Sequence, residues 1–169
     1  LDVAVSGDGF FQILQPDGTL AYTRDGSFKL SPLGQLTTSS GALLQPTIQV
    51  PNNAQSLTIG ADGSVSIQTF GQTASTVVGN IQLARFINPA GLESIGQNLL
   101  RATTASGPVQ QLKPGTNGAG QLVQGGLEAS NVNVVEEMVN MIETQRAYEI
   151  NSKAISAVDQ MLKFVNTNM

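Results

Sequence analysis

The sequence lacks cysteine, histidine and tryptophan altogether. Without cysteine the chain forms no disulfide and carries no thiolate nucleophile. Without histidine it has neither the commonest general base nor the usual zinc ligand. We therefore expect no catalytic residue, no metal site and no cofactor. The redox compartment is not indicated, since a cysteine-free chain tolerates any of them.

Charge and aromatic side chains are scarce as well, at 12% and 5% of the residues. The 8 Lys and Arg residues are dispersed, the net charge is -4 and the pI is about 4.6. Duplex nucleic acid is therefore not an expected partner, because its binding depends on clustered positive charge. No apolar run approaches the roughly 20 residues that span a membrane, so we expect no membrane insertion.

The beginning of the chain carries no charged segment followed by an apolar one, so we expect no cleaved signal peptide. The first residue is Leu, and the sequence opens directly on a strand-like DVAV. We expect that the natural N-terminal part is missing.

Glycine and proline divide the chain into unlike parts. All 18 Gly and all 7 Pro lie between residues 1 and 126, and the last 40 residues contain neither. We predict a β-rich core domain over residues 1–102, an extended linker rich in Gly, Pro and Ser over 103–130, and a C-terminal amphipathic assembly helix over 131–169. The core, ending near Ala102, is expected to fold alone.

Short apolar runs broken by turn residues indicate β-strands in the core. The predicted strands are Asp2–Ser6, Phe10–Leu14, Leu20–Thr23, Ser27–Leu30, Gln35–Thr38, Thr47–Val50, Ser56–Ile59, Ser64–Gln68, Thr73–Val78 and Asn80–Phe86. Asp-Gly pairs between such runs are a strong hairpin signal. The predicted fold class is mainly β with a long C-terminal α-helix: an antiparallel β-sandwich or barrel-like core plus a helical stem.

Two features resemble chemical sites and are better explained by structure. A pair of carboxylates serves glycosidases, but Asp8, Asp17, Asp25 and Asp62 each precede Gly, which is typical of turns. The stretch 115–120 is rich in Gly, but its spacing does not match a dinucleotide-binding or phosphate-binding loop.

The C-terminal segment carries the most specific pattern. Apolar residues recur every seven positions at Val134, Met141, Tyr148, Ile155 and Leu162. Companions follow four residues later in the first half and three residues later in the second, namely Met138, Gln145, Ser152, Val158 and Val165. This is a heptad pattern with polar members and a change of face near its middle. Asn133 is a plausible N-cap, with Glu136 placed as in a capping box.

Two partners are possible for this stripe. The helix could lie on its own β-domain, but the linker is long and a helix of this length would leave much of the stripe uncovered. We therefore predict that it packs on another helix, from the missing N-terminal part, from other copies of the chain, or from both.

At this point the sequence resembles the bacterial flagellar rod and hook (axial) protein family. The stretch SNVNVVEEMVNMIETQRAYEINSKAISAVDQML (130–162) is similar to the C-terminal signature of that family. GDGFFQI (7–13) and YTRDGSFKLSPLGQLTTSSG (22–41) are similar to its β-core, and two later stretches, 91–107 and 114–132, to its later core and linker. Within the family, the similarity is greatest to the distal rod protein.

The resemblance implies a structural subunit of the basal-body distal rod. Such subunits stack helically into a hollow drive shaft that crosses the periplasm and transmits torque. The implied partners are copies of the chain, neighbouring rod and hook subunits, and the flagellar type III export apparatus. The implied subunit interface lies on the helix, at Val134, Met138, Met141, Gln145, Arg146, Tyr148, Ile155, Val158 and Leu162.

Two alternatives stay open. One is a proximal rod or hook subunit of the same family. The other, of a different class, is an adhesive or carbohydrate-binding β-module with a helical oligomerisation stalk. Such a module needs exposed aromatic side chains for sugar stacking, and the candidates are Phe10, Phe11, Tyr22, Phe28, Phe70 and Phe86.

Overall fold

The structure is a computed structural model that describes residues 1–72 and 74–167. Residue 73 of the predicted strand 73–78, and residues 168–169 of the predicted helix, lie outside the described residues. The chain divides into two compact units, Leu1–Glu128 and Ala129–Met169. We call the first the β unit. The second contains one helix, α1.

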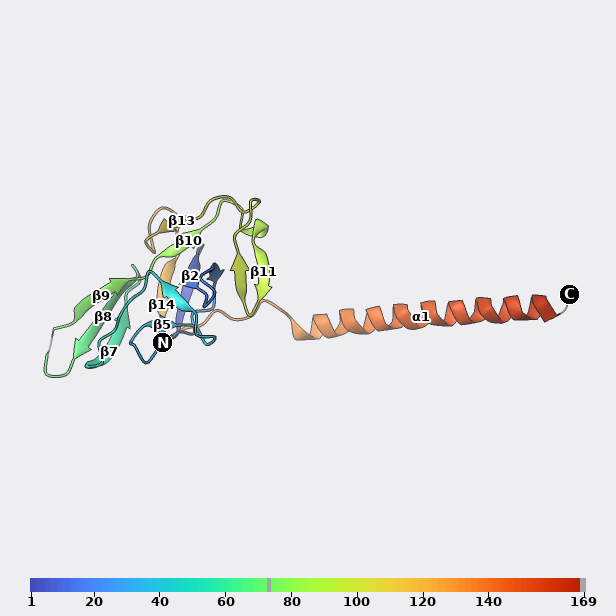
Figure 1. The fold of residues 1–169 in the computed structure, drawn as a ribbon, viewed down its shortest axis with the longest axis horizontal. Helices are drawn as coiled ribbons and strands as arrows, with labels where there is room; N and C mark the ends of the chain where they lie inside the picture. Colours follow the sequence, from blue (N-terminus) through green and yellow to red (C-terminus); the bar gives the residue numbers. More distant parts are fainter. Residues whose placement is uncertain (73, 168–169) are drawn as a thin grey trace. The chain divides into compact units, whose positions relative to one another are not determined.

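Figure 1 shows the order of the elements along the chain. They are β1 Val3–Ser6, β2 Phe10–Leu14, β3 Leu20–Thr23, β4 Lys29–Leu30, β5 Leu36–Thr37, β6 Leu43–Gln45, β7 Ala54–Ile59, β8 Ser64–Thr69, β9 Thr76–Asn80, β10 Leu83–Arg85, the 3₁₀-helix η1 Pro89–Gly91, β11 Glu93–Gly96, β12 Leu99–Arg101, β13 Gln110–Leu112, β14 Gln121–Gln124 and α1 Val134–Thr167. The predicted mainly β core with a long C-terminal helix is confirmed.

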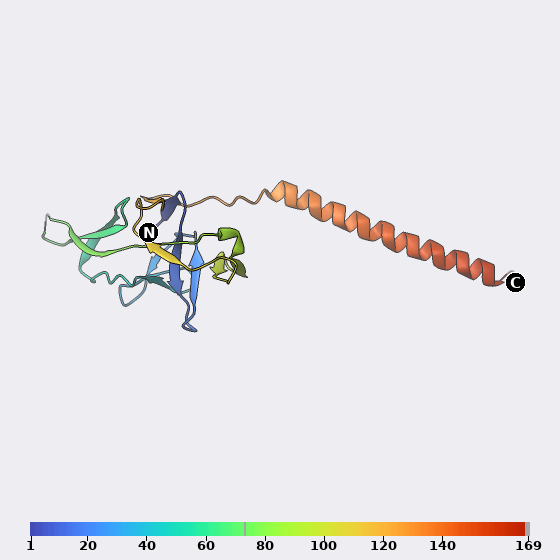
Figure 2. The ribbon, with the colours of Figure 1, turned by 90° about the horizontal axis from the view of Figure 1, so that it is seen from above.

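The strands form three antiparallel sheets. The largest has the order β11-β12-β3-β2-β6-β5-β4, and β10 pairs with both β2 and β13. β7, β8 and β9 form a three-stranded sheet, and β1 pairs with β14. Figure 2 shows the three-stranded sheet and the β11–β12 hairpin at opposite ends of the β unit. The sheets are layered rather than closed, so the fold is sandwich-like and not a barrel.

One apolar cluster holds the three sheets together. Its members include Val3 and Leu122 from the two-stranded sheet, Phe11 from the large sheet, and Ile59 and Val65 from the three-stranded sheet. All five side chains are buried. Since burial of a large apolar side chain contributes about 1.5–3 kcal/mol, the three sheets stabilise one another through this shared cluster.

Most of the aromatic residues belong to the core. Phe11 and Phe28 meet edge to face at 5.0 Å between ring centroids, and Tyr22 and Phe86 do so at 4.8 Å. These four are buried, and Phe10 is half-buried. Phe70, at the end of β8, is the one exposed aromatic among the six sugar-stacking candidates.

The segment predicted as a linker, 103–130, contributes two strands to the β unit instead. β13 pairs with β10 and β14 pairs with β1, and the unit extends to Glu128. These strands have only three and four residues, and Leu122 is the one fully buried large side chain in them. So weak an apolar pattern among glycines did not suggest strands in the sequence.

The predicted and observed strands differ at two other places. Residues 47–50 form a single bridge, between Gln35 and Gln49, and the neighbouring strand is β6. The apolar alternation there reflects burial of Ile48 and Val50 without regular pairing. The hairpin β11–β12 was not predicted. Its turn residues Gln97 and Asn98 both have positive φ, as a type I′ turn requires. They are not the Asn-Gly pair that usually marks such a turn in a sequence.

Three of the four aspartates that precede Gly close turns, as predicted. In each case Oδ1 accepts hydrogen bonds from the backbone N–H and the hydroxyl two residues later: Asp17 from Thr19, Asp25 from Ser27 and Asp62 from Ser64. Gly26 follows one of them because a Cβ there would lie 1.7 Å from the Val3 carbonyl oxygen. Asp8 differs, since it acts through its backbone carbonyl, which accepts from Gly120 N–H.

We expect a fragment of residues 1–128 to unfold cooperatively and a fragment of residues 1–102 not to. The shorter fragment loses β14, the partner of β1, together with Leu122. Losing one buried Leu side chain alone costs about 2–5 kcal/mol, which is a large part of the about 5–15 kcal/mol of a typical domain. Thermal unfolding followed by circular dichroism tests this. A cooperative transition at an unchanged midpoint in the shorter fragment would contradict the boundary at Glu128.

The turn carboxylates make stability depend on pH. The hydrogen bonds from the Thr19 and Ser64 hydroxyls, and then from their N–H groups, lower the pKa of Asp17 and Asp62 below 3.8. A lowered folded pKa adds stability above pH 3.8 that is lost as pH falls through the folded pKa. We expect Asp62→Asn to lower the melting temperature modestly at pH 7, and the difference from wild type to be smaller near pH 2. An equal difference at both pH values would contradict this.

Candidate interaction surface

Helix α1 begins where the sequence predicts a cap. The Asn133 Oδ1 accepts the backbone N–H of Val135 at 3.1 Å, and its carbonyl accepts the N–H of Glu137 at 3.0 Å. Asn133 is therefore the N-cap. Glu136 and Glu137 occupy the first turn, where negative charge is favoured by the helix dipole. With neither Gly nor Pro, the helix continues unbroken for 34 residues, roughly 50 Å (Figure 1).

The helix exposes large apolar side chains along its whole described length. Thirteen of them are 50% to 77% exposed: Val134, Val135, Met138, Val139, Met141, Ile142, Tyr148, Ile150, Ile155, Val158, Met161, Leu162 and Phe164. Proteins rarely leave so continuous an apolar surface in water, and such surfaces mark interaction sites. This surface is the candidate functional site.

The structure places all nine predicted interface residues on α1 and exposes each of them. At 3.6 residues per turn, a seven-residue repeat drifts by about 20° per heptad on a straight helix. The stripe from Val134 to Leu162 therefore winds around α1 by roughly 80°. Its role as a subunit interface stays a prediction.

Six exposed apolar residues lie outside the predicted list. They are Val135, Val139, Ile142, Ile150, Met161 and Phe164. A seven-residue repeat followed over the whole helix does not select them. Treating the two halves separately would have found Val135, Val139, Ile142 and Met161, because each half has its own apolar face.

Two of the hydroxyl side chains on α1 are satisfied within the helix. The Thr144 hydroxyl donates to the Asn140 carbonyl at 2.8 Å, and the Ser156 hydroxyl donates to the Ser152 carbonyl at 3.0 Å. Such back-bonding uses the donor locally. These two hydroxyl groups therefore need no further hydrogen-bond acceptor if a neighbouring surface covers them.

Arg24 fixes the point where the chain leaves the β unit. Its Nε lies 2.6 Å from Glu128 Oε2, and its terminal nitrogens donate to the carbonyls of Val5, Gly7 and Gly9 at 3.0 Å. One guanidinium thus ties β1 and the following turn to the last residue of the unit. Only residues 129–133 separate Glu128 from α1.

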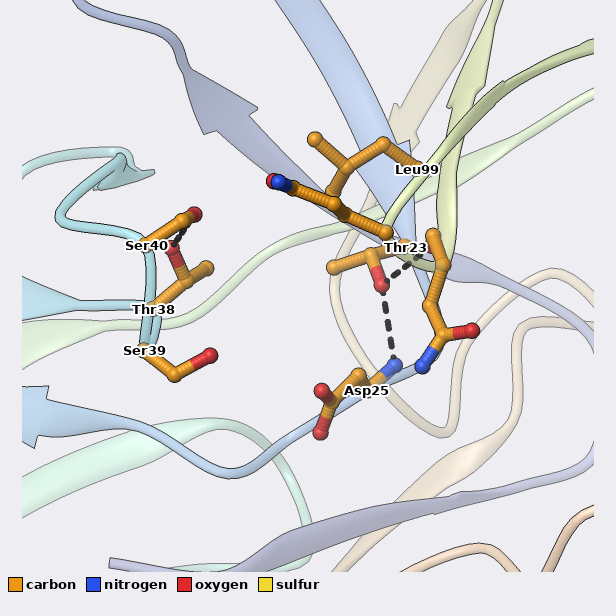
Figure 3. Close-up of a pocket in the computed structure, with 8 residues that line it drawn as sticks. Thr23, Asp25, Thr38, Ser39, Ser40 and Leu99 are labelled. Carbon is orange, nitrogen blue, oxygen red and sulfur yellow. Dashed lines mark hydrogen bonds between the residues drawn. The ribbon is translucent and has the colours of Figure 1, made fainter.

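The β unit contains a polar hollow, shown in Figure 3. Its volume is about 320 Å³, and it lies between residues 23–25, the turn 38–40 and the β11–β12 turn. The Thr23 hydroxyl donates to the Asn98 carbonyl at 2.8 Å and accepts the N–H of Asp25 at 3.0 Å. Asp25 is the only ionisable residue of the eight that line the hollow, and Ser27 engages its Oδ1. The hollow thus has no acid–base pair and no activated nucleophile.

Among residues 1–72 and 74–167, no three acidic side chains lie close enough together to hold a metal ion. Within these ranges, no helix combines the length and apolar character that crossing a bilayer requires.

Two family descriptions match the sequence. Residues 4–67 match the flagellar hook protein FlgE/F/G D1 domain, and residues 123–168 match the flagellar basal body rod FlgEFG protein C-terminal region. The first match covers β1 to β8 and the second covers the end of the β unit and α1.

Individual relatives are similar over nearly the whole chain. The flagellar basal-body rod protein FlgG of Buchnera aphidicola subsp. Acyrthosiphon pisum is 54% identical over 162 residues, which cover 96% of this chain and 62% of that protein. FlgG of Borreliella burgdorferi is 51% identical, covering 98% and 63%. The rod protein FlgF of Escherichia coli is 36% identical, covering 94% and 64%. The chain thus spans about three-fifths of the length of these relatives.

We expect the amides of α1 to exchange with solvent faster than those of β2 in dilute solution. An isolated helix gains most of its stability from burial of its apolar face, and that face is exposed here. Protection of residues 138–162 should rise with protein concentration, while protection of β2 should not. Hydrogen exchange with mass spectrometry at two concentrations measures both. Strong, concentration-independent protection of α1 would contradict an uncovered helix.

Proposed function

Because the chain belongs to the flagellar rod and hook protein family, we propose that it is a structural subunit of the basal-body distal rod. In this proposal, copies of the chain assemble helically into a hollow shaft that crosses the periplasm and transmits torque to the hook. The partners are other copies and the adjoining rod and hook subunits. The subunit reaches the shaft through the flagellar export apparatus.

One observation carries the proposal: α1 exposes thirteen large apolar side chains over 34 residues, next to a β unit with its own core. The β unit has its own buried core, so we expect it to fold without a partner. The helix has no comparable core, and it gains stability when other helices cover it. This division of roles is what an assembly subunit needs.

The chemistry of the chain supports a structural rather than an enzymatic role. Histidine and cysteine are absent from the sequence, and three of the four aspartates that precede Gly hold turns. The absence of cysteine also suits export in an unfolded state, because no disulfide has to form on arrival. An adhesive module is less well supported, because the core buries Phe11, Tyr22, Phe28 and Phe86.

The proposal is tested by locating the protein in isolated basal bodies. An antibody against the β unit, with gold label, should mark the distal segment of the rod in electron micrographs. Label on the hook or the proximal rod would favour the other members of the family. Label absent from all axial structures would overturn the proposed function.

We expect the double variant Met141→Asp/Ile155→Asp to abolish swimming while the β unit melts at the wild-type temperature. Burying an unpaired carboxylate costs several kcal/mol, so assembly should weaken by at least about 100-fold. Soft-agar motility and rod length in basal bodies measure the effect in cells. Differential scanning calorimetry measures the melting temperature of the purified variant.

The matched control is Asn140→Asp/Ser156→Asp. It adds the same two charges to the same helix, at positions that lie among the polar side chains of their half of α1. This variant should swim. Equal loss of motility in both variants would mean that charge on α1, rather than interruption of its apolar surface, causes the defect.

A further inference from the structure

The apolar surface of α1 changes sides near the middle of the helix. At 100° per residue, the apolar residues of the first half centre on one direction, and those of the second half centre nearly 180° away. We call the first set the N-patch: Val134, Val135, Met138, Val139, Met141 and Ile142. Tyr148 and Ile150 lie at its edges, on either side of Glu149. We call the second set the C-patch: Ile155, Val158, Met161 and Leu162. Phe164 lies outside it, on the side of the N-patch.

Most polar residues change sides in the opposite sense, except that Gln145, Arg146 and Glu149 lie on the side of the N-patch. Glu136, Asn140 and Glu143 lie opposite the N-patch, whereas Ser156 and Lys163 lie opposite the C-patch. A single partner helix on one side of α1 would therefore meet an apolar surface over one half and a polar surface over the other. Covering both patches takes partners on two nearly opposite sides, at two levels along the axis.

The placement of the patches distinguishes two kinds of assembly. A patch that pairs with its own copy gives a closed two-fold dimer, whereas two different patches that pair with each other give an open stack. Take two parallel helices that lie side by side, shifted along the axis with only a small rotation between them. The side of the first helix that faces the second then points in the direction opposite to the side of the second helix that faces the first. Two patches nearly 180° apart satisfy this condition when the shift brings them to the same level.

We propose that the N-patch of each copy packs against the C-patch of the next, with the two helices parallel and shifted by about 16–20 residues, or roughly 24–30 Å. At this shift Ile142 of one copy lies between Val158 and Leu162 of its neighbour. Each copy then uses one patch for each of two neighbours, so the contact repeats without closing. The proposal rests on the proposed function and specifies which surfaces of α1 meet.

Charge supports a second copy as the occupant. The first half of α1 carries Glu136, Glu137, Glu143 and Glu149 with a single Arg146, and so is acidic. The second half carries Lys153 and Lys163 with a single Asp159, and so is slightly basic. A shift of half a helix places the acidic half of one copy beside the basic half of the next. Pairing equal halves would bring like charges together.

The absence of native cysteine allows a direct test by disulfide trapping. The full chain is prepared as two double variants, Ile142→Cys/Val158→Cys and Ile142→Cys/Leu162→Cys, and as each single variant. After mild oxidation, at least one double variant should give a ladder of covalent oligomers on a non-reducing gel. A mixture of Ile142→Cys with the matching single variant should stop at a dimer. Each single variant alone should give no more dimer than Asn140→Cys, which reports chance collision.

Other outcomes overturn the inference. Homodimers of Ile142→Cys or Val158→Cys above the collision control would show that a patch pairs with itself. Neither double variant forming a ladder would show that the two patches do not meet. Labelling of the distal rod by the antibody is independent of which patches meet. Labelled rods without a ladder therefore reject only this inference, and unlabelled rods reject the proposed function.

Discussion

The structure depends on one constraint: α1 carries apolar surface that the helix itself cannot bury. A 34-residue helix satisfies all but its terminal backbone groups internally, but its large apolar side chains from Val134 to Phe164 stay exposed. Isolated helices are marginal in water, so order in this segment is tied to whatever covers it. Under the proposed function, assembly supplies the cover, and the folding of α1 and the growth of the shaft become one process.

The core of the β unit does not depend on what covers α1. Its three sheets share one buried cluster, and β14 returns the chain to pair with β1 before the helix begins. Arg24 then holds Glu128 with a charge-assisted hydrogen bond, at a side-chain exposure of 31%. Such a pair is partly screened by solvent and contributes little stability. Its effect is geometric, because it leaves only residues 129–133 between a fixed point and α1.

The sequence predicted the parts of the molecule whose local pattern is strong. The helix and its N-cap at Asn133 follow from the loss of Gly and Pro and from the polar residue before the first turn. The Asp-Gly turns at residues 17, 25 and 62 follow from their local hydrogen bonding. The strands β13 and β14 did not follow, because only Leu122 is deeply buried in them and their pairing partners lie far away in the chain. A single heptad stripe was predicted for α1. The stripe exists, but it runs along the edges of two patches, which emerge only when each half of the helix is considered separately.

The two patches also bear on how strongly the copies associate. Burying one large apolar side chain contributes about 1.5–3 kcal/mol, and association of two proteins costs an estimated 4–15 kcal/mol. The gain from one patch is of the same order as that cost, so a contact between two free copies is weak. A copy within a stack gains the burial of both patches, but it loses its translational and rotational freedom only once. The interior of the proposed shaft is therefore much more stable than its ends or any small oligomer, which disfavours assembly before the subunit reaches a growing end.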